Sequence, residues 1–140
     1  MRPLLAALAA SAAVFALGGC QATEDVRSGV EQARSSAASL GSGAADACRA
    51  SRPHVTTLND LADRLAADPD LRVQLAPQVR RAVGQLTASV GDQPELQPAV
   101  VAARDLAESI GQANRASVEL AARQAQAALV STRTLCNLAG

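Results

Sequence analysis

Apolar residues recur at helical spacing along the chain from Ala47 onward. Residues three and four positions apart lie on one face of an α-helix, whereas a half-buried strand alternates apolar and polar residues. No stretch after Ala47 alternates in that way. The pattern therefore predicts an all-α fold. Two apolar faces are clearest, one formed by Val55, Leu58, Leu61, Ala62 and Leu65, the other by Leu71, Leu75, Val79, Val83, Leu86 and Val90.

Proline and glycine mark the expected helix boundaries. Pro69 disfavours helical backbone at Asp68, so the first helix should end there. Asp68 can then cap the next helix, with Pro69 in its first turn. Pro77 falls inside this second helix and is expected to kink or divide it. The sequence GDQPELQP (91–98) is the next break, and either of its prolines can open the helix that follows.

Residues 99–138 contain no proline and can form either one helix or two. A single helix of this length would measure about 60 Å, roughly twice the length of the others. Gly111 is its internal weak point, because Gly costs about 1 kcal/mol relative to Ala within a helix. Periodicity alone therefore leaves a three-helix and a four-helix arrangement open.

A different apolar segment lies at the N-terminus. One positive charge, at Arg2, precedes a run of 14 uncharged and mainly apolar residues (4–17, LLAALAASAAVFAL), and Gly18 and Gly19 follow. As a helix, this run would cover about 21 Å, which is short of the roughly 30 Å hydrocarbon core of a bilayer. The layout is typical of an export signal rather than of a permanent membrane span.

Cys20 follows the two glycines directly. Together, Leu17, Gly18, Gly19 and Cys20 resemble the lipobox of bacterial lipoproteins, in which a dedicated peptidase cuts before a cysteine that carries diacylglycerol. The resemblance covers residues 1–20 only and identifies no family for the rest of the chain. It implies that Cys20 becomes an acylated N-terminus and that a membrane is a partner. Two or three acyl chains such as palmitate, at about 0.8 kcal/mol per buried CH₂, would hold the protein there firmly.

The chain has three cysteines, Cys20, Cys48 and Cys136. In an exported protein, an odd number of cysteines leaves one thiol without a disulfide partner in the chain. Acylation of Cys20 would leave an even pair in a compartment where disulfides persist. A disulfide requires Cα atoms within about 7 Å of each other, so the start of the first helix must lie beside the end of the last. Four helices running up-down-up-down bring those ends to one pole.

A straight, long third helix would place the two cysteines at opposite poles. We therefore expect a small antiparallel bundle of four helices, with one disulfide between Cys48 and Cys136 and a turn at about Gly111 to Asn114. Three helices with one long C-terminal helix remain the alternative.

The expected organisation has three parts. Residues 1–19 form the cleaved signal, residues 20–45 a lipidated tether, and residues 46–140 the helical bundle. Residues 21–45 are rich in Ser, Gly and Ala, and their apolar residues make only a thin stripe, so we expect a fraying helix over about 24–40 that ends at Gly41 and Gly43. A flexible linker of this length spans about 25–30 Å. Docking of the helix on the bundle as an extra member is the alternative.

Charge and aromatic content narrow the functional classes. Basic and acidic residues number 13 each, which gives no reason to expect a nucleic-acid partner. The only aromatic residue, Phe15, lies in the expected signal, so the mature chain has no ring on which to stack a sugar or a base.

The charged residues are mostly spaced as i,i+4 ion pairs on helix surfaces, a spacing that stabilises an isolated helix by about 0.2–0.5 kcal/mol per pair. Arg80 and Arg81 could contact anionic lipid, but two adjacent arginines are also common on solvated helices. The expected pairs are Arg27–Glu31, Asp60–Arg64, Arg104–Glu108, Arg115–Glu119 and Glu119–Arg123.

No catalytic site, metal site or cofactor is predicted, and we expect the protein not to be an enzyme. His54 is the only histidine, which excludes metal sites with two histidines, and a site from Cys48 and His54 would need a free thiol. Ser51, His54 and Asp60 have the residue types of a hydrolase triad, but their spacing matches no nucleophile motif. We expect His54, directly after Pro53, in an exposed first helical turn.

Two functional hypotheses follow. The first is a lipid-anchored, extracytoplasmic protein of the cell envelope with a non-enzymatic role, either structural or in binding another envelope protein. The alternative is a binding module that holds a small apolar ligand inside the bundle. The many small side chains argue against it, because they let the helices approach closely and fill the core. The anchor would lie in the cell membrane. If the host has two membranes, Gln21 in place of Asp after Cys20 resembles lipoproteins sent to the outer membrane, and the resemblance implies an anchor there.

Overall fold

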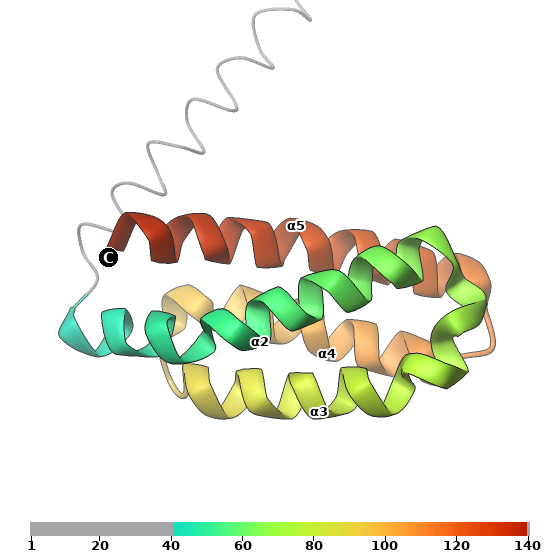
Figure 1. Cartoon of the computed structure of the whole chain (residues 1–140), viewed down its shortest axis with the longest axis horizontal. Coiled ribbons are helices and arrows are strands. Elements are labelled where there is room, and N and C mark those ends of the chain that lie inside the picture. The colour runs from blue at the N-terminus through green and yellow to red at the C-terminus, as the bar shows by residue number, and fades with distance from the viewer. Residues whose placement is uncertain (1–40, 140) are drawn as a thin grey trace, which may run out of the picture. The chain divides into compact units, whose positions relative to one another are not determined.

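Figure 1 shows an antiparallel bundle of α-helices in the computed structural model of the chain, which describes residues 41–139. Four α-helices make up the bundle: α2 (Ser42–Ala67), α3 (Arg72–Val90), α4 (Gln97–Gly111) and α5 (Arg115–Ala139). Two short 3₁₀ helices precede α3 and α4, namely η1 (Pro69–Leu71) and η2 (Pro94–Leu96). Residues 41–139 contain no strand. The predicted all-α class and the count of four helices are confirmed.

Successive helices run in opposite directions. In Figure 1, α2 and α4 run one way and α3 and α5 the other, so α2 begins at the pole where α5 ends. Each helix packs against its neighbours in the chain, and α5 closes the bundle by packing against α2. The up-down-up-down arrangement is confirmed, and the alternative with one long C-terminal helix is wrong.

The turn between α4 and α5 lies where the sequence predicts it. α4 ends at Gly111, and Gln112 has extended backbone at φ −87° and ψ 132°. Asn114 Oδ1 accepts hydrogen bonds from the N–H groups of Ala116 (3.0 Å) and Ser117 (3.4 Å), which would otherwise lack partners at the start of α5. The break between the two helices therefore depends on Gly111, at which α4 ends, and on Asn114, which caps the start of α5.

The boundary between α2 and α3 also follows the sequence. α2 ends at Ala67, and Asp68 leaves the helical region with φ −141° and ψ 91°. Asp68 Oδ1 accepts a 3.1 Å hydrogen bond from the N–H of Asp70, while Pro69 occupies the first turn of η1. The predicted cap is confirmed.

Pro77 does not divide α3, which runs unbroken from Arg72 to Val90. Proline removes the hydrogen bond to the carbonyl four residues earlier, here that of Val73. Val73 is 76% exposed and Pro77 is exposed, so this carbonyl lies on the solvent side of the helix, where water can replace the lost bond. The expectation of a divided helix is therefore wrong.

The bundle begins earlier than predicted. α2 starts at Ser42 rather than at 46, so Gly41 precedes its first turn and Gly43 lies within it. The destabilising effect of glycine applies mainly to the middle of a helix, and Gly43 lies in the first turn. Ala44, only 3% exposed, already belongs to the packed domain. The signal expected in residues 1–19 and the helix expected over 24–40 lie outside the described residues.

One apolar core fills the bundle and extends from Ala47 to Cys136. Both predicted apolar faces point into it, and of their residues only Leu71 is partly exposed. Alanines at buried positions let the helix backbones approach closely. The largest fully buried side chains include Leu58, Leu65, Leu75, Leu86, Leu96, Leu106 and Leu129.

The surface ion pairs differ from the prediction. Arg123 and Glu119 form the expected pair at 2.8 Å, but Arg115 pairs with Asp70 instead of Glu119. Exposed pairs gain little free energy, so a side chain readily takes a different partner nearby. Within residues 41–139, the expected pairs Asp60–Arg64 and Arg104–Glu108 are not within ion-pair distance. The pair Arg27–Glu31 lies outside the described residues.

Candidate functional site at the disulfide pole

A disulfide joins the first helix of the bundle to the last. Cys48 of α2 and Cys136 of α5 are bonded with an S–S distance of 2.05 Å and a Cα–Cα distance of 5.3 Å. Both residues are buried, at 3% and 6% exposure. The predicted pairing is confirmed, and it fixes the pole at which α2 begins and α5 ends. We refer to this end of the molecule as the disulfide pole.

Two buried hydroxyl side chains lie beside the disulfide. Ser51 is fully buried and donates a 3.3 Å hydrogen bond to the carbonyl of Cys48, and Thr132 is buried on the facing side of α5. With Val55 they line a crevice of about 10 Å³. That volume suits about one water molecule, whereas ligand pockets are typically about 300 Å³ or larger. The crevice is therefore too small for an organic ligand.

An open hollow of about 700 Å³ lies on the outer side of the disulfide. Arg49 and Arg52 contribute polar side chains from α2, and Asn137 contributes its amide from α5. Arg133 borders the adjoining crevice, one helical turn before Asn137. Four further residues line the hollow: Ala45, Cys48, Cys136 and Ala139.

The hollow has more positive than negative charge around it. Arg49 pairs with Asp46 at 3.1 Å, and both side chains are largely exposed, at 79% and 73%. Neither Arg52 nor Arg133 has a carboxylate within ion-pair distance among residues 41–139. Within the described part of the chain, two guanidinium groups from two helices therefore line one crevice without an ion-pair partner.

Farther along the contact between α2 and α5, three polar side chains form a chain of hydrogen bonds. Asn59 Nδ2 donates to Asp63 Oδ2 at 3.3 Å, and Gln126 Nε2 of α5 donates to Asp63 Oδ1. Asn59 Oδ1 is buried and has no partner in the described part of the chain. This network links the two helices and fixes their register, but it contains no pair of groups suited to acid–base catalysis.

The residues with the types of a hydrolase triad do not form one. Ser51, His54 and Asp60 all lie on α2, and none of them donates a hydrogen bond to another. The hydroxyl of Ser51 is buried and bonded to the carbonyl of Cys48, while Asp60 is exposed.

The prediction that His54 lies in an exposed first helical turn is wrong. His54 lies twelve residues after the start of α2 and is half-buried, because the helix begins at Ser42 and continues through Pro53. Cys48 is part of the disulfide and offers no thiolate to a metal. Among the described residues, no group of three or more His, Cys, Asp or Glu side chains is placed to hold a metal ion.

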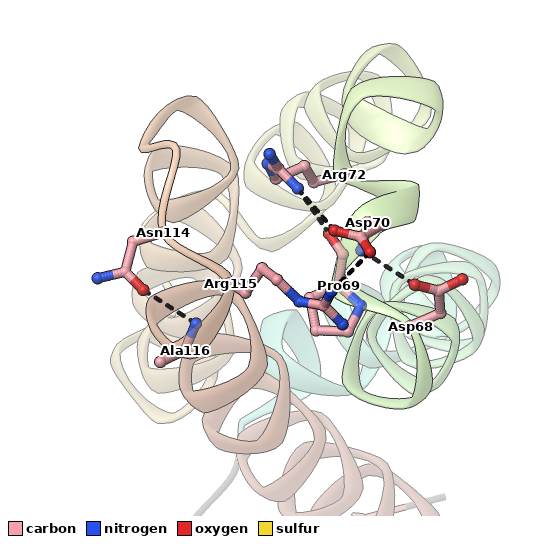
Figure 2. A network of polar contacts seen from close by, with 7 residues as sticks. All are labelled: Asp68, Pro69, Asp70, Arg72, Asn114, Arg115 and Ala116. Carbon is pink, nitrogen blue, oxygen red and sulfur yellow. Dashed lines mark hydrogen bonds and ion pairs between the residues drawn. The ribbon is translucent and has the colours of Figure 1, made fainter.

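At the opposite pole, a polar network joins the two loops (Figure 2). The carboxylate of Asp70 accepts hydrogen bonds from Arg72 at 3.3 Å and from Arg115 at 2.8 Å. Arg72 also donates to the carbonyl of Pro69 at 3.4 Å. No sequence pattern predicts the contact between Asp70 and Arg115, which are 45 residues apart. We interpret this network as a structural contact between η1 and the start of α5.

Comparisons with protein-family models, with curated proteins and with solved structures find no match to this chain. None of the helices in residues 41–139 is long and apolar enough to cross a membrane. Cys20, the expected point of lipid attachment, lies outside the described residues.

Proposed function

We propose that the protein is a lipid-anchored helical protein of the cell envelope, with a non-enzymatic role in binding another envelope protein or in envelope structure. The disulfide is the observation that carries this proposal. Because Cys48 bonds to Cys136, Cys20 is left as the odd cysteine, directly after a segment with the layout of an export signal. A disulfide also persists best in an oxidising, extracytoplasmic compartment.

The position of the disulfide suits a domain held by its N-terminus. The chain enters the bundle at Gly41, and Cys48 lies only seven residues farther on. Tension transmitted from an anchor at Cys20 would therefore reach α2 close to a covalent bond with α5. The two helices could not be pulled apart at this pole without breaking that bond.

The outer face of α5 is the surface best suited to a protein partner. No charged residue lies between Arg123 and Arg133, and three of the five large apolar side chains that are exposed in the described residues, Leu120, Val130 and Leu138, lie on α5. Val130 and Leu138 are exposed by 45% and 47% on this face. A surface without charges loses little solvation when a partner covers it, and the cores of protein interfaces are depleted of charged residues.

Metabolic labelling with an alkyne analogue of palmitate tests the anchor in an export-competent bacterial host. The wild-type protein should incorporate the label, and Cys20→Ala should not. The double variant Cys48→Ala/Cys136→Ala is the matched control, because it removes cysteines without removing the proposed acylation site, and it should remain labelled. An unlabelled wild-type protein, or label retained in Cys20→Ala, would contradict the proposal.

Photo-crosslinking in intact cells tests the binding role. A crosslinking amino acid at Val130 or at Leu138 should capture the same envelope protein in each case. The matched control is Val73, which is more exposed than either and lies on α3, and it should not capture that protein. If positions 130 and 138 yield only the uncrosslinked monomer, the outer face of α5 is not a binding surface.

A further inference from the structure

We infer that the disulfide pole is an interaction surface for the anionic headgroups of a phospholipid bilayer. The inference rests on the proposed lipid anchor, which would hold this pole near the membrane. The residues that carry it are Arg49 and Arg52, which line the open hollow beside the disulfide, and Arg133, which lines the adjoining crevice together with Arg52. The surface is defined by these three arginines and Asn137.

The chemistry of the hollow suits a phosphate group. A guanidinium presents a planar set of N–H donors that can bind two phosphate oxygens at once. Asn137 of α5 adds a side-chain amide to the lining of the hollow. Among residues 41–139, Asp46 is the carboxylate that pairs with one of these arginines, Arg49, and no carboxylate of this range lies within ion-pair distance of Arg52 or Arg133. Apolar groups at the rim, from Ala45 and Ala139, would contact the glycerol and upper acyl region.

The hollow is open enough for a headgroup to enter from outside. Its volume of about 700 Å³ lies within the range of ligand-binding clefts, and its arginines are exposed rather than folded into the core. The adjoining crevice between Ser51 and Thr132 is about 10 Å³ and admits no acyl chain. The headgroup would therefore rest on the pole while its acyl chains stay in the bilayer.

The place where the tether joins the bundle favours a membrane over a soluble acidic partner. Cys20 to Leu40 is 21 residues, and a flexible linker of that length would span about 25 Å on average. α2 is 26 residues long, which places its far end about 39 Å farther away. Electrostatic attraction is screened beyond about 8–10 Å at physiological salt, so the pole at Gly41 is the end that can approach the headgroups.

Arg80, Arg81 and Arg104 lie away from the disulfide pole. Arg80 and Arg81 are exposed in the middle of α3, and they do not line the open hollow or the crevice at the disulfide pole. They and Arg104 of α4 have no ion-pair partner within residues 41–139. These three arginines therefore provide a control with the same change in net charge on a different surface.

Vesicle binding by the unacylated, oxidised chain from Gln21 onward tests the inference. This chain contains the whole apolar core, which extends from Ala47 to Cys136, so it carries what the bundle needs to fold. Binding is measured at low salt to vesicles of phosphatidylcholine alone and to vesicles that also contain phosphatidylglycerol. We expect the chain to bind the anionic vesicles and not the zwitterionic ones.

The triple variant Arg49→Gln/Arg52→Gln/Arg133→Gln should lose binding to anionic vesicles by about fivefold per arginine, which is on the order of 100-fold in total. The control variant Arg80→Gln/Arg81→Gln/Arg104→Gln should stay close to wild type. Thermal unfolding of both variants establishes that they remain folded. Millimolar inorganic phosphate should not compete, because a single free anion lacks the many headgroups of a surface.

Three results would overturn the inference: equal loss in both triple variants, which would indicate a net-charge effect; no preference for anionic vesicles; or displacement by inorganic phosphate, which would indicate a soluble anion as the ligand. Because the tested chain has no lipid, a negative result here leaves the anchor at Cys20 untouched. Loss of palmitate labelling at Cys20, conversely, would leave this binding measurement valid.

Discussion

The guanidinium of Arg115 lies 2.8 Å from Oδ2 of Asp70, a residue 45 positions earlier in the chain. This contact joins η1 to the start of α5 at the pole opposite the disulfide (Figure 2). The bundle is thus closed differently at its two poles. A buried covalent bond closes one, and a polar contact between side chains that are 63% and 56% exposed closes the other.

We expect the Asp70–Arg115 contact to contribute only modestly to stability. A double-mutant cycle with Asp70→Asn and Arg115→Gln should give a coupling free energy of about 0.2–1 kcal/mol, as is typical of exposed ion pairs. Urea unfolding at low and at molar salt measures it, and the coupling should shrink at high salt because the charges are screened. A coupling of several kcal/mol that is insensitive to salt would show that this pole is held more rigidly than its exposure indicates.

Removing the disulfide should lower the free energy of unfolding much more than removing the Asp70–Arg115 contact does. Cys48 and Cys136 are 88 residues apart, and on the chain-entropy model a bridge of that span stabilises the fold by up to about 4.5 kcal/mol. The double variant Cys48→Ala/Cys136→Ala should therefore unfold at markedly lower urea concentration than the oxidised wild type.

Addition of a reductant provides the control for this prediction. It should lower the stability of the wild type toward that of the double variant and leave the double variant unchanged. If the oxidised wild type and the double variant unfold at the same urea concentration, the disulfide does not stabilise the domain.

Two glycines should respond in opposite directions to substitution by alanine. Gly91 follows α3 with φ 58° and ψ −133°, a conformation that residues with a Cβ atom rarely adopt. Gly84 lies inside α3, is exposed, and has open space where a Cβ would stand. Gly91→Ala should destabilise the fold by about 1–2 kcal/mol, and Gly84→Ala should stabilise it by about 0.5–1 kcal/mol.

The unfolding free energies of the two variants, compared with that of wild type, check this pair of predictions. Neither position has an atom within 4 Å of an added Cβ, so any difference must come from the backbone rather than from a steric clash. Equal effects of the two substitutions would contradict the backbone conformation at Gly91.

Much of the fold could be predicted from the sequence because local chemistry determines it. Asp68 and Pro69 set a boundary through the rules of helix capping, and Gly111 weakens the chain where α4 ends. The choice between three and four helices needed long-range information, which the requirement that Cys48 meet Cys136 supplied. Boundaries without a strong local signal were less accurate, as the start of α2 and the consequent position of His54 show.

The candidate site could be predicted only in part. Helical periodicity identifies which face of a helix is buried, but it does not specify which exposed residues of two helices lie side by side. Arg52 and Arg133 are 81 positions apart and carry no shared motif, so their place at one crevice depends on how α2 packs against α5. The pairing of Arg115 with Asp70 rather than Glu119 was missed for the same reason.

The mass of the N-terminal tryptic peptide of the mature protein tests the lipid anchor most directly. In protein purified from an exporting bacterial host, we expect this peptide to cover Cys20 to Arg27 and to carry the added mass of diacylglycerol on the cysteine. The variant Cys20→Ala should yield no such peptide. A wild-type peptide that still contains residues before Cys20, or one that begins at Cys20 without added mass, would contradict the account.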